Sequence, residues 1–206
     1  MNISELLSPV TEDMKAVDAV IRARLNSDVV LIRTVGDYII QAGGKRMRPA
    51  MLLMVARALG YDGRLHHLLA AVVEFIHTST LLHDDVVDES DLRRGRSTAN
   101  AVFGNAASVL VGDYLYSRSF EMMVEADSMR VMQVFSKATT IIAEGEVLQL
   151  LNVHDPDVSL ERYLQVVRYK TAKLFEAAAQ VGAIVAHASP EQEAAAAAYG
   201  RHIGTA

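Results

Sequence analysis

Long stretches rich in apolar residues, with few breaks between them, run along the whole chain. The chain has only four prolines and 12 glycines, and Ala, Leu, Met and Glu, which favour helices, are common. Gly43-Gly44 is followed by Lys45-Arg46, which does not alternate between apolar and polar residues as a hairpin strand would. We therefore predict an all-α chain folded as one bundle.

The breaks divide the chain into eight predicted helices. Ser159 is a candidate N-cap, and Ser189-Pro190-Glu191-Gln192 matches a capping box with proline in the first turn. The helix that opens there continues to residue 206 without a stop signal, so we expect the chain to end within a helix. The predicted helices span residues 12–25, 30–41, 49–59, 66–89, 105–125, 129–151, 160–187 and 190–206.

Length and composition exclude several classes of protein. The 206 residues suit one domain, and a hydrophobic share of 51% is too high for a disordered chain. No run approaches about 18 to 20 uncharged apolar residues, so we predict no transmembrane segment. Acidic residues are spread through the first 20 positions, which does not fit a signal peptide, so we expect a cytoplasmic protein.

Charge and cysteine content narrow the chemistry. The absence of cysteine removes disulfides, thiolate nucleophiles and Cys-type zinc sites. A net charge of −5 argues against a sequence-independent nucleic-acid binder.

An acidic motif near the middle of the chain carries the strongest chemical signal. Asp84 and Asp88 are four residues apart, so on the predicted helix they point the same way, and Asp85 lies about 100° round it. Like charges beside buried leucines need compensation. Hard carboxylate oxygens favour Mg²⁺, which binds one or two carboxylates and fills its shell with water and substrate phosphate. The alternative is an acidic helix end neutralised by the arginines that follow.

Three groups of basic residues add to this motif. Residues 43–49, Gly-Gly-Lys-Arg-Met-Arg-Pro, place three cations and two glycines before a helix start, which suits a diphosphate although it is not a P-loop. Arg93-Arg94-Gly95 follows the acids, and Lys170-Thr171 lies inside a predicted helix. Each group alone is explained as well by a solvated basic surface. Together, the acids and cations indicate a site for metal plus phosphate.

In these motifs, and in Gly112-Asp113, the chain resembles the trans-isoprenyl diphosphate synthases over essentially its whole length. The resemblance implies an isoprenoid synthase-type helical bundle with Mg²⁺ as cofactor. It also implies a prenyltransferase that elongates an allylic prenyl diphosphate with isopentenyl diphosphate. The run from Phe75 to Tyr114 is most similar to bacterial members that make octaprenyl diphosphate for the ubiquinone side chain. Members making shorter or longer chains remain the alternative.

The resemblance also assigns roles to individual residues. Two polyanionic substrates need separate sets of cations, and the reaction needs no protein nucleophile. Without the resemblance, His77 would be interpreted as a core histidine, and His83 is left as structural. The isopentenyl diphosphate is expected on Lys45, Arg48, His77 and Arg94. The allylic diphosphate is expected through Mg²⁺ on Asp84 and Asp88, within the motif that includes Asp85, assisted by Arg93, Lys170 and Thr171, with Glu146 and Gln149 lining its pocket.

Small residues before the acidic motif bear on product length. Ser79 and Thr80 stand about one turn before Asp84, where short-chain members of the family tend to have aromatic residues. We therefore expect an open pocket and a long product, limited deeper by bulk such as Met123, or by Phe120 or Met122.

The chain departs from the family in one respect. The second aspartate-rich motif, with the Phe-Gln pair before it, is absent from residues 1–206. We therefore expect residues 1–206 to be one all-helical domain that is incomplete at its C-terminus and has little activity as it stands. A non-catalytic subunit, a class I terpene cyclase and a non-enzymatic helical protein are the other interpretations. The family also implies a homodimer and transient membrane contact for product release.

Overall fold

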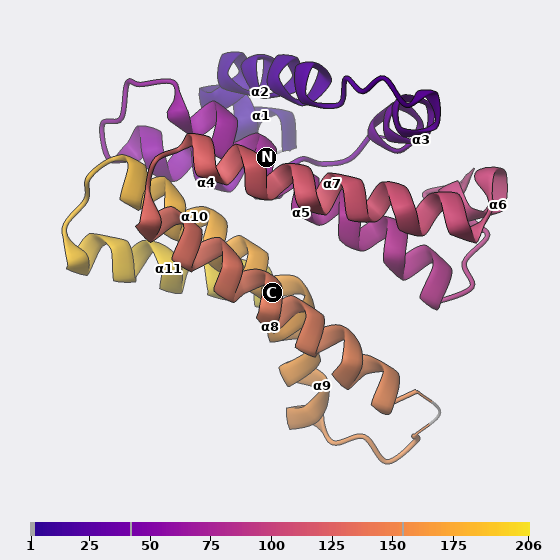
Figure 1. Cartoon of the computed structure of the whole chain (residues 1–206). Helices are drawn as coiled ribbons and strands as arrows, with labels where there is room; N and C mark the ends of the chain where they lie inside the picture. Colours follow the sequence, from indigo (N-terminus) through magenta and orange to yellow (C-terminus); the bar gives the residue numbers. More distant parts are fainter. Residues whose placement is uncertain (1–2, 42, 154) are drawn as a thin grey trace.

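Helices make up nearly all of the described structure (Figure 1). The computed structural model describes residues 3–41, 43–153 and 155–206. Its helices are α1 (Ile3–Leu7), α2 (Thr11–Arg24), α3 (Val30–Gln41), α4 (Met47–Ala58), α5 (Leu65–Val87), α6 (Ala99–Phe103), α7 (Asn105–Glu125), α8 (Met129–Leu151), α9 (Leu160–Val166), α10 (Lys173–Val185) and α11 (Pro190–Thr205). A 3-10 turn covers Ser8–Val10, a π-helical segment, Val167–Ala172, joins α9 to α10, and two strands, β1 (Leu92–Arg93) and β2 (Arg96–Ser97), pair antiparallel.

The predicted all-α class is confirmed, and each of the eight predicted helices is present with bounds within two residues of those expected. The predicted caps are also present. The Ser159 hydroxyl accepts from the Arg162 N–H, and Ser189 and Gln192 form a reciprocal capping box ahead of α11. The predicted helix 160–187 is one helical rod, α9 to α10, interrupted by the π-helical segment.

The small hairpin β1–β2 was not predicted from the sequence. Its turn is Arg94-Gly95, and both residues have positive φ angles, 54° and 77°. Such a turn usually carries Asn-Gly or Gly-Gly, so Arg-Gly gave no signal, and strands of two residues are too short to alternate. The hairpin folds back toward α5, which gives it a part in the site described below.

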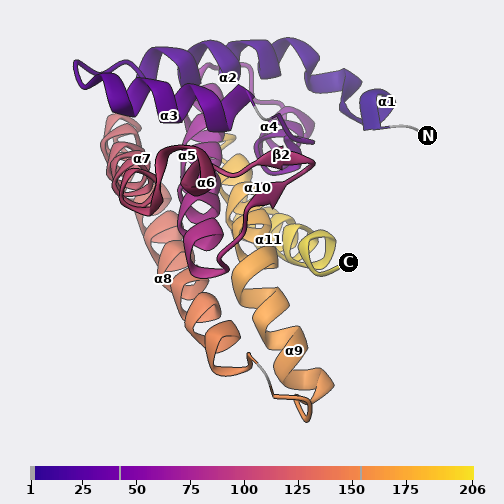
Figure 2. The same ribbon diagram turned by 90° about the vertical axis from the view of Figure 1, so that its right-hand side faces the viewer.

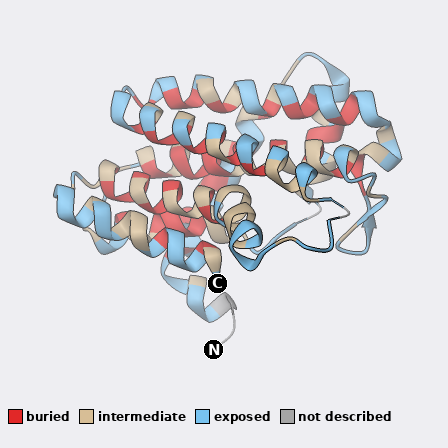
Figure 3. Ribbon diagram, turned by 90° about the horizontal axis from the view of Figure 1, so that it is seen from below, coloured by how far each residue is buried: buried red, intermediate tan, exposed pale blue. Residues whose placement is uncertain are grey.

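The helix α5 is the centre of the bundle. It packs against α7 along its length and also contacts α4, α2 and α10. The helices α2 and α3 lie along one side of the bundle, and α11 packs outside α10 (Figures 1 and 2). Buried residues gather on the inward faces of the helices (Figure 3). The end of α8 and α9 project from this body with their connecting loop (Figure 1).

Among the described helices, α5 is long and apolar enough to cross a membrane by length and composition. It carries Glu74, Asp84 and Asp85, and 61% of its most apolar window is buried inside the molecule. The core helix of a globular bundle has the same character, because it is apolar on nearly every side.

Candidate functional site

Two cavities lie on different faces of α5. Its residues Glu74, His77, Thr78 and Leu81, spaced i, i+3, i+4 and i+7, line a cavity of about 650 Å³. A second cavity of about 290 Å³ is lined by Ile76, Ser79, Thr80 and His83 of the same helix. These residues have the same spacing, and their series begins two residues after Glu74. Residues at such spacings share one helix face, so α5 is the wall between the cavities. We call them the basic cavity and the acidic cavity.

The basic cavity gathers all four of the predicted isopentenyl diphosphate residues. Lys45, Arg48, His77 and Arg94 all line it. Arg48 Nη1 lies 3.3 Å from His77 Nε2, and its guanidinium stacks over the Phe175 ring, 4.7 Å from the centroid. Arg48 Nε is buried without a hydrogen-bond partner among the described residues. A held guanidinium with a free N–H suits a diphosphate oxygen.

Electrostatics keep His77 neutral in this cavity. Burial, followed by the positive charge of Arg48, lowers the pKa of His77 to about 3. The imidazole is therefore uncharged at neutral pH and acts as a hydrogen-bonding group. Burial also lowers the pKa of Arg48 from its ordinary value, although guanidinium remains protonated in proteins.

The acidic cavity lies beneath the end of α5 that carries the aspartates. Asp84 and Glu146 line it with Asp113, and Tyr116 and Ile142 are among its other walls. Asp88 caps α5 one turn beyond Asp84, and its N–H donates to the Asp84 carbonyl at 2.7 Å. The side chain of Asp88 is exposed. Of the two predicted metal residues, Asp84 therefore lines a mainly apolar cavity, and Asp88 lies one turn beyond it on α5.

Lys170 links α8, α5 and the π-helical segment. Its Nζ lies 2.6 Å from Glu146 Oε2 and 3.5 Å from Asp84 Oδ2. Burial is the main reason that the pKa values of Asp84 and Glu146 are raised. Burial opposes the charge of Lys170, but the hydrogen bond to Glu146 and the charge of Asp84 outweigh it, so its pKa is also raised. The ammonium is thus held between two carboxylates that would otherwise repel each other.

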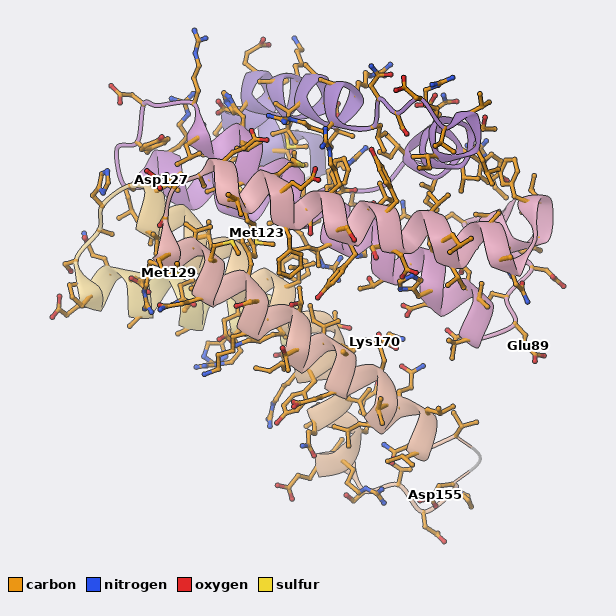
Figure 4. The ribbon with its side chains drawn as sticks, in the orientation of Figure 1. Glu89, Met123, Asp127, Met129, Asp155 and Lys170 are labelled. Carbon is orange, nitrogen blue, oxygen red and sulfur yellow. The ribbon has the colours of Figure 1, made fainter. Side chains whose placement is uncertain are left out.

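A close approach of two helices places Lys170 there. A Cβ on Gly145 of α8 would lie 2.8 Å from the Lys170 backbone nitrogen and 2.8 Å from Tyr169 Cβ, which only glycine avoids. Lys170 and Thr171 both lie in the π-helical segment, and such segments often occur at functional sites. Figure 4 shows Lys170 beside α8 in the middle of the molecule.

Of the three residues predicted to set product length, two line the acidic cavity and one does not. Ser79 and Thr80 line the acidic cavity, and the Ser79 hydroxyl donates to the Gly112 carbonyl at 2.9 Å. Met123 is fully buried but is not among the residues that line this cavity. It lies near the end of α7, where the chain turns into α8 (Figure 4). Its role as a deeper limit on product length stays a prediction.

Asp85 of the acidic motif, predicted as a catalytic residue with Asp84 and Asp88, is engaged by an arginine of the hairpin. Its side chain is fully buried, and Arg93 donates to Asp85 Oδ1 from Nε at 2.9 Å and from Nη2 at 2.7 Å. The hairpin that carries Arg93 brings the two together. The geometry does not support Asp85 as a group that touches substrate, because its carboxylate instead fixes the guanidinium of Arg93 beside α5.

Several polar and aromatic contacts in the two cavities were not predicted from the sequence. Arg46 and Glu74 form an ion pair at the basic cavity, Phe175 holds Arg48, and Tyr116 lines the acidic cavity. The position of Glu74, three residues before His77 on the same helix, was the one available signal. The others depend on contacts between distant segments. Of the predicted pocket residues, Glu146 lines the acidic cavity, whereas Gln149 does not.

A second polar cluster lies away from both cavities. Asp13 of α2 is buried, and its carboxylate accepts from Arg57 at 3.0 and 2.7 Å and lies 2.8 Å from His67 Nε2 and 3.3 Å from His66 Nε2. The three residues Asp13, His66 and His67 lie close enough to hold a metal ion. The bound guanidinium already compensates the carboxylate, so we interpret the cluster as an anchor between α2, α4 and the start of α5.

Comparison with known proteins places the chain in one family. The sequence model described as polyprenyl synthetase matches residues 29–206. Octaprenyl diphosphate synthase of Escherichia coli (strain K12) is 56% identical over 206 residues, which are 100% of this chain and 64% of that protein. The chain thus spans less than two thirds of that relative's length.

Solved structures show the same likeness. Polyprenyl synthase from Caulobacter crescentus, in complex with calcium and isoprenyl diphosphate, has a TM-score of 0.96 at 46% identity and covers 98% of this chain and 62% of its own. A decaprenyl diphosphate synthase from Rhodobacter capsulatus has a TM-score of 0.95 at 49% identity and covers 99% and 63%. The fold is therefore the isoprenoid synthase-type bundle, and the chain belongs to the polyprenyl synthetase family.

Proposed function

We propose that this protein elongates an allylic prenyl diphosphate with isopentenyl diphosphate. The observation that carries the proposal is that two cavities with different linings lie on different faces of α5. Four residues line the basic cavity, namely Lys45, Arg48, His77 and Arg94, and Asp84 lines the acidic cavity. This arrangement supports a condensation of two diphosphates, because each polyanion requires its own set of charged groups.

The basic cavity is the proposed isopentenyl diphosphate site. Lys45 is exposed and, within the described ranges, forms no ion pair, so its ammonium is free for a phosphate oxygen. Arg48 and Arg94 add two guanidinium groups, whose N–H groups match phosphate geometry. His77 is neutral and donates or accepts a hydrogen bond without altering the charge of the cavity.

The acidic cavity is the proposed site of the allylic tail, with Asp84 and Asp88 holding Mg²⁺ at its mouth. The donors fit this ion, because they are carboxylates placed one turn apart, and no thiol exists in the chain. Bound there, Mg²⁺ would neutralise the charge that develops on the departing diphosphate. Lys170, with Thr171 beside it, and Arg93, fixed by Asp85, are the proposed protein contacts to that diphosphate.

The proposed chemistry balances without a protein nucleophile. The allylic C–O bond breaks, and its electron pair leaves with the diphosphate while a delocalised carbocation remains. The double bond of isopentenyl diphosphate attacks the cation to form the new C–C bond. The adjacent carbon then loses a proton to the departing diphosphate. Lys170 stabilises the leaving charge, and the apolar walls Ile76 and Ile142 exclude water from the cation.

Octaprenyl diphosphate for the ubiquinone side chain is the proposed product. The identity of 56% to an octaprenyl diphosphate synthase supports it, as do the small side chains of Ser79 and Thr80 in the acidic cavity. Products of other lengths are the alternative. A homodimer, a cytoplasmic location, transient membrane contact and one domain over residues 1–206 stay predictions.

The test is incorporation of radiolabelled isopentenyl diphosphate into an apolar product. Farnesyl diphosphate and Mg²⁺ are supplied, and the label makes low turnover measurable. We expect incorporation that requires all three components and is lost in Asp84→Asn. Consumption of farnesyl diphosphate without isopentenyl diphosphate would instead indicate a terpene cyclase, and the absence of Mg²⁺-dependent diphosphate binding would indicate a non-enzymatic protein.

A further inference from the structure

The ion pair between Arg46 and Glu74 stands at the edge of the basic cavity. Arg46 Nη1 lies 2.8 Å from Glu74 Oε1, and the two side chains are only 17% and 13% exposed. Asp18 of α2 lies further off, 3.8 Å from Arg46 Nη2, and is half exposed. Glu74 therefore provides the close and shielded partner of Arg46.

Glu74 places a carboxylate in the cavity proposed to bind a diphosphate. It lines the basic cavity together with Arg48, His77 and Arg94, so its negative charge would repel a diphosphate there. Burial raises the pKa of Glu74, against the opposing charges of Arg46 and Arg48. A buried carboxylate that disfavours the ligand needs another reason for its position.

The backbone of Arg46 provides that reason. Its φ of 50° lies in the left-handed region, which residues with a side chain seldom adopt. Arg46 is also the N-cap of α4 and makes no side-chain capping bond. Its conformation joins Lys45, in the preceding loop, to Arg48, in the first turn of α4, and so sets the direction of both. The Arg46–Glu74 ion pair is the contact that holds it to α5.

The loop is held from the other side as well. Arg94 Nη1 donates to the Gly43 carbonyl, so the segment around Lys45 is fixed at Gly43 and at Arg46. Arg46 and Arg94 both line the cavity, but the guanidinium of Arg46 is engaged by a carboxylate, whereas that of Arg94 meets a backbone carbonyl. The two arginines therefore differ in what they offer to a ligand.

We propose that Glu74 is a positioning residue for the basic cavity: through Arg46 it holds Lys45 and Arg48 in the arrangement that receives the diphosphate of isopentenyl diphosphate. The inference rests on the proposed function of this cavity. It assigns Arg46, the middle cation of residues 43–49, to the protein rather than to the substrate.

The two possible roles of Glu74 predict opposite changes in affinity for isopentenyl diphosphate. Glu74→Gln removes a negative charge from an anion site, so local electrostatics alone predict tighter binding of isopentenyl diphosphate. Loss of positioning predicts weaker binding, by about tenfold or ~1.4 kcal/mol. Binding is measured by calorimetry without Mg²⁺, which separates it from the acidic cavity. Asp18→Asn is the matched control, because Asp18 faces the same guanidinium from further away, and we expect less than a twofold change.

Two further measurements complete the test. The double variant Arg46→Gln/Glu74→Gln leaves neither charge unpaired, and we expect it to bind no more weakly than Arg46→Gln alone. The Ala50 N–H donates to the Arg46 carbonyl at 3.1 Å, so its hydrogen exchange should quicken in Glu74→Gln, which a purely electrostatic role would not cause. If the unchanged protein fails to bind isopentenyl diphosphate, the proposed function of the cavity fails. If it binds, and Glu74→Gln binds as tightly or more tightly, the positioning role is overturned.

Discussion

Lys170 Nζ lies 3.5 Å from Asp84 Oδ2 while it bonds Glu146 at 2.6 Å. The ammonium thus lies where it would repel a metal ion bound to Asp84. It is also a fixed positive charge that would attract a diphosphate bound beside Asp84. It should therefore oppose Mg²⁺ binding when diphosphate is absent and favour diphosphate binding when Mg²⁺ is present.

Lys170→Ala tests this double effect by calorimetry. We expect Mg²⁺ alone to bind several-fold more tightly, and farnesyl diphosphate with Mg²⁺ to bind about tenfold more weakly, a loss of ~1.4 kcal/mol. Lys173→Ala is the matched control, because Lys173 is similarly shielded but pairs with Glu176 at 2.6 Å within α10. Equal effects of the two substitutions would remove Lys170 from the site.

Gly145→Ala tests the helix contact that positions Lys170. Helix propensity alone predicts stabilisation of about 0.5–1 kcal/mol. The new Cβ would meet backbone of the π-helical segment at 2.8 Å, so we expect destabilisation of about 1–3 kcal/mol instead, together with weaker Mg²⁺-dependent diphosphate binding. Denaturant unfolding measures the first effect. Glu144→Ala, at the neighbouring exposed position, should leave both properties unchanged.

Thr80→Phe tests whether the acidic cavity holds the allylic tail. Thr80 is partly exposed and lines that cavity, whereas Ser79→Tyr would also break the bond to Gly112. We expect Thr80→Phe to shorten the product and to weaken binding of geranylgeranyl diphosphate more than that of dimethylallyl diphosphate. Product analysis and calorimetry measure the two effects. Unchanged product length and equal effects on the two ligands would exclude an open floor at this position.

His77 gives a pH prediction with a defined sign. Its pKa is lowered to about 3 in the folded protein, from about 6.5 when unfolded. Between these values the unfolded state binds a proton that the folded state does not, so His77 reduces stability progressively as the pH falls from 6.5 towards 3. The unfolding midpoint should therefore fall less steeply with acid in His77→Gln. The same slope in both proteins would show that His77 titrates normally.

Patterns within a single segment predicted the helices, because breaks and caps such as Ser159 and the Ser189 capping box act within one turn. The same is true of the spacing of Asp84 and Asp88. Contacts between distant segments were not predictable in this way. Asp85 meets Arg93 only because the Arg94-Gly95 turn folds the chain back.

The sequence predicted which residue types form the site, but it did not predict which of them contact one another. The cations of residues 43–49 were taken as one group, yet Arg46 is engaged by Glu74, far along the chain. The π-helical segment at Lys170 follows from the close approach at Gly145, which no pattern in either helix reveals. The role of Met123 as a deeper limit on product length stays a prediction, because its orientation depends on packing between helices.

If α5 separates two diphosphate sites, crossed binding measurements will distinguish them. Isopentenyl diphosphate is titrated without Mg²⁺, and farnesyl diphosphate with Mg²⁺, into Lys45→Ala and Asp84→Asn. We predict that Lys45→Ala lowers the affinity for isopentenyl diphosphate about tenfold or more and leaves that for farnesyl diphosphate unchanged. Asp84→Asn should lower the affinity for farnesyl diphosphate as much and leave that for isopentenyl diphosphate unchanged. If each substitution weakened the binding of both ligands equally, the two cavities would not be separate diphosphate sites.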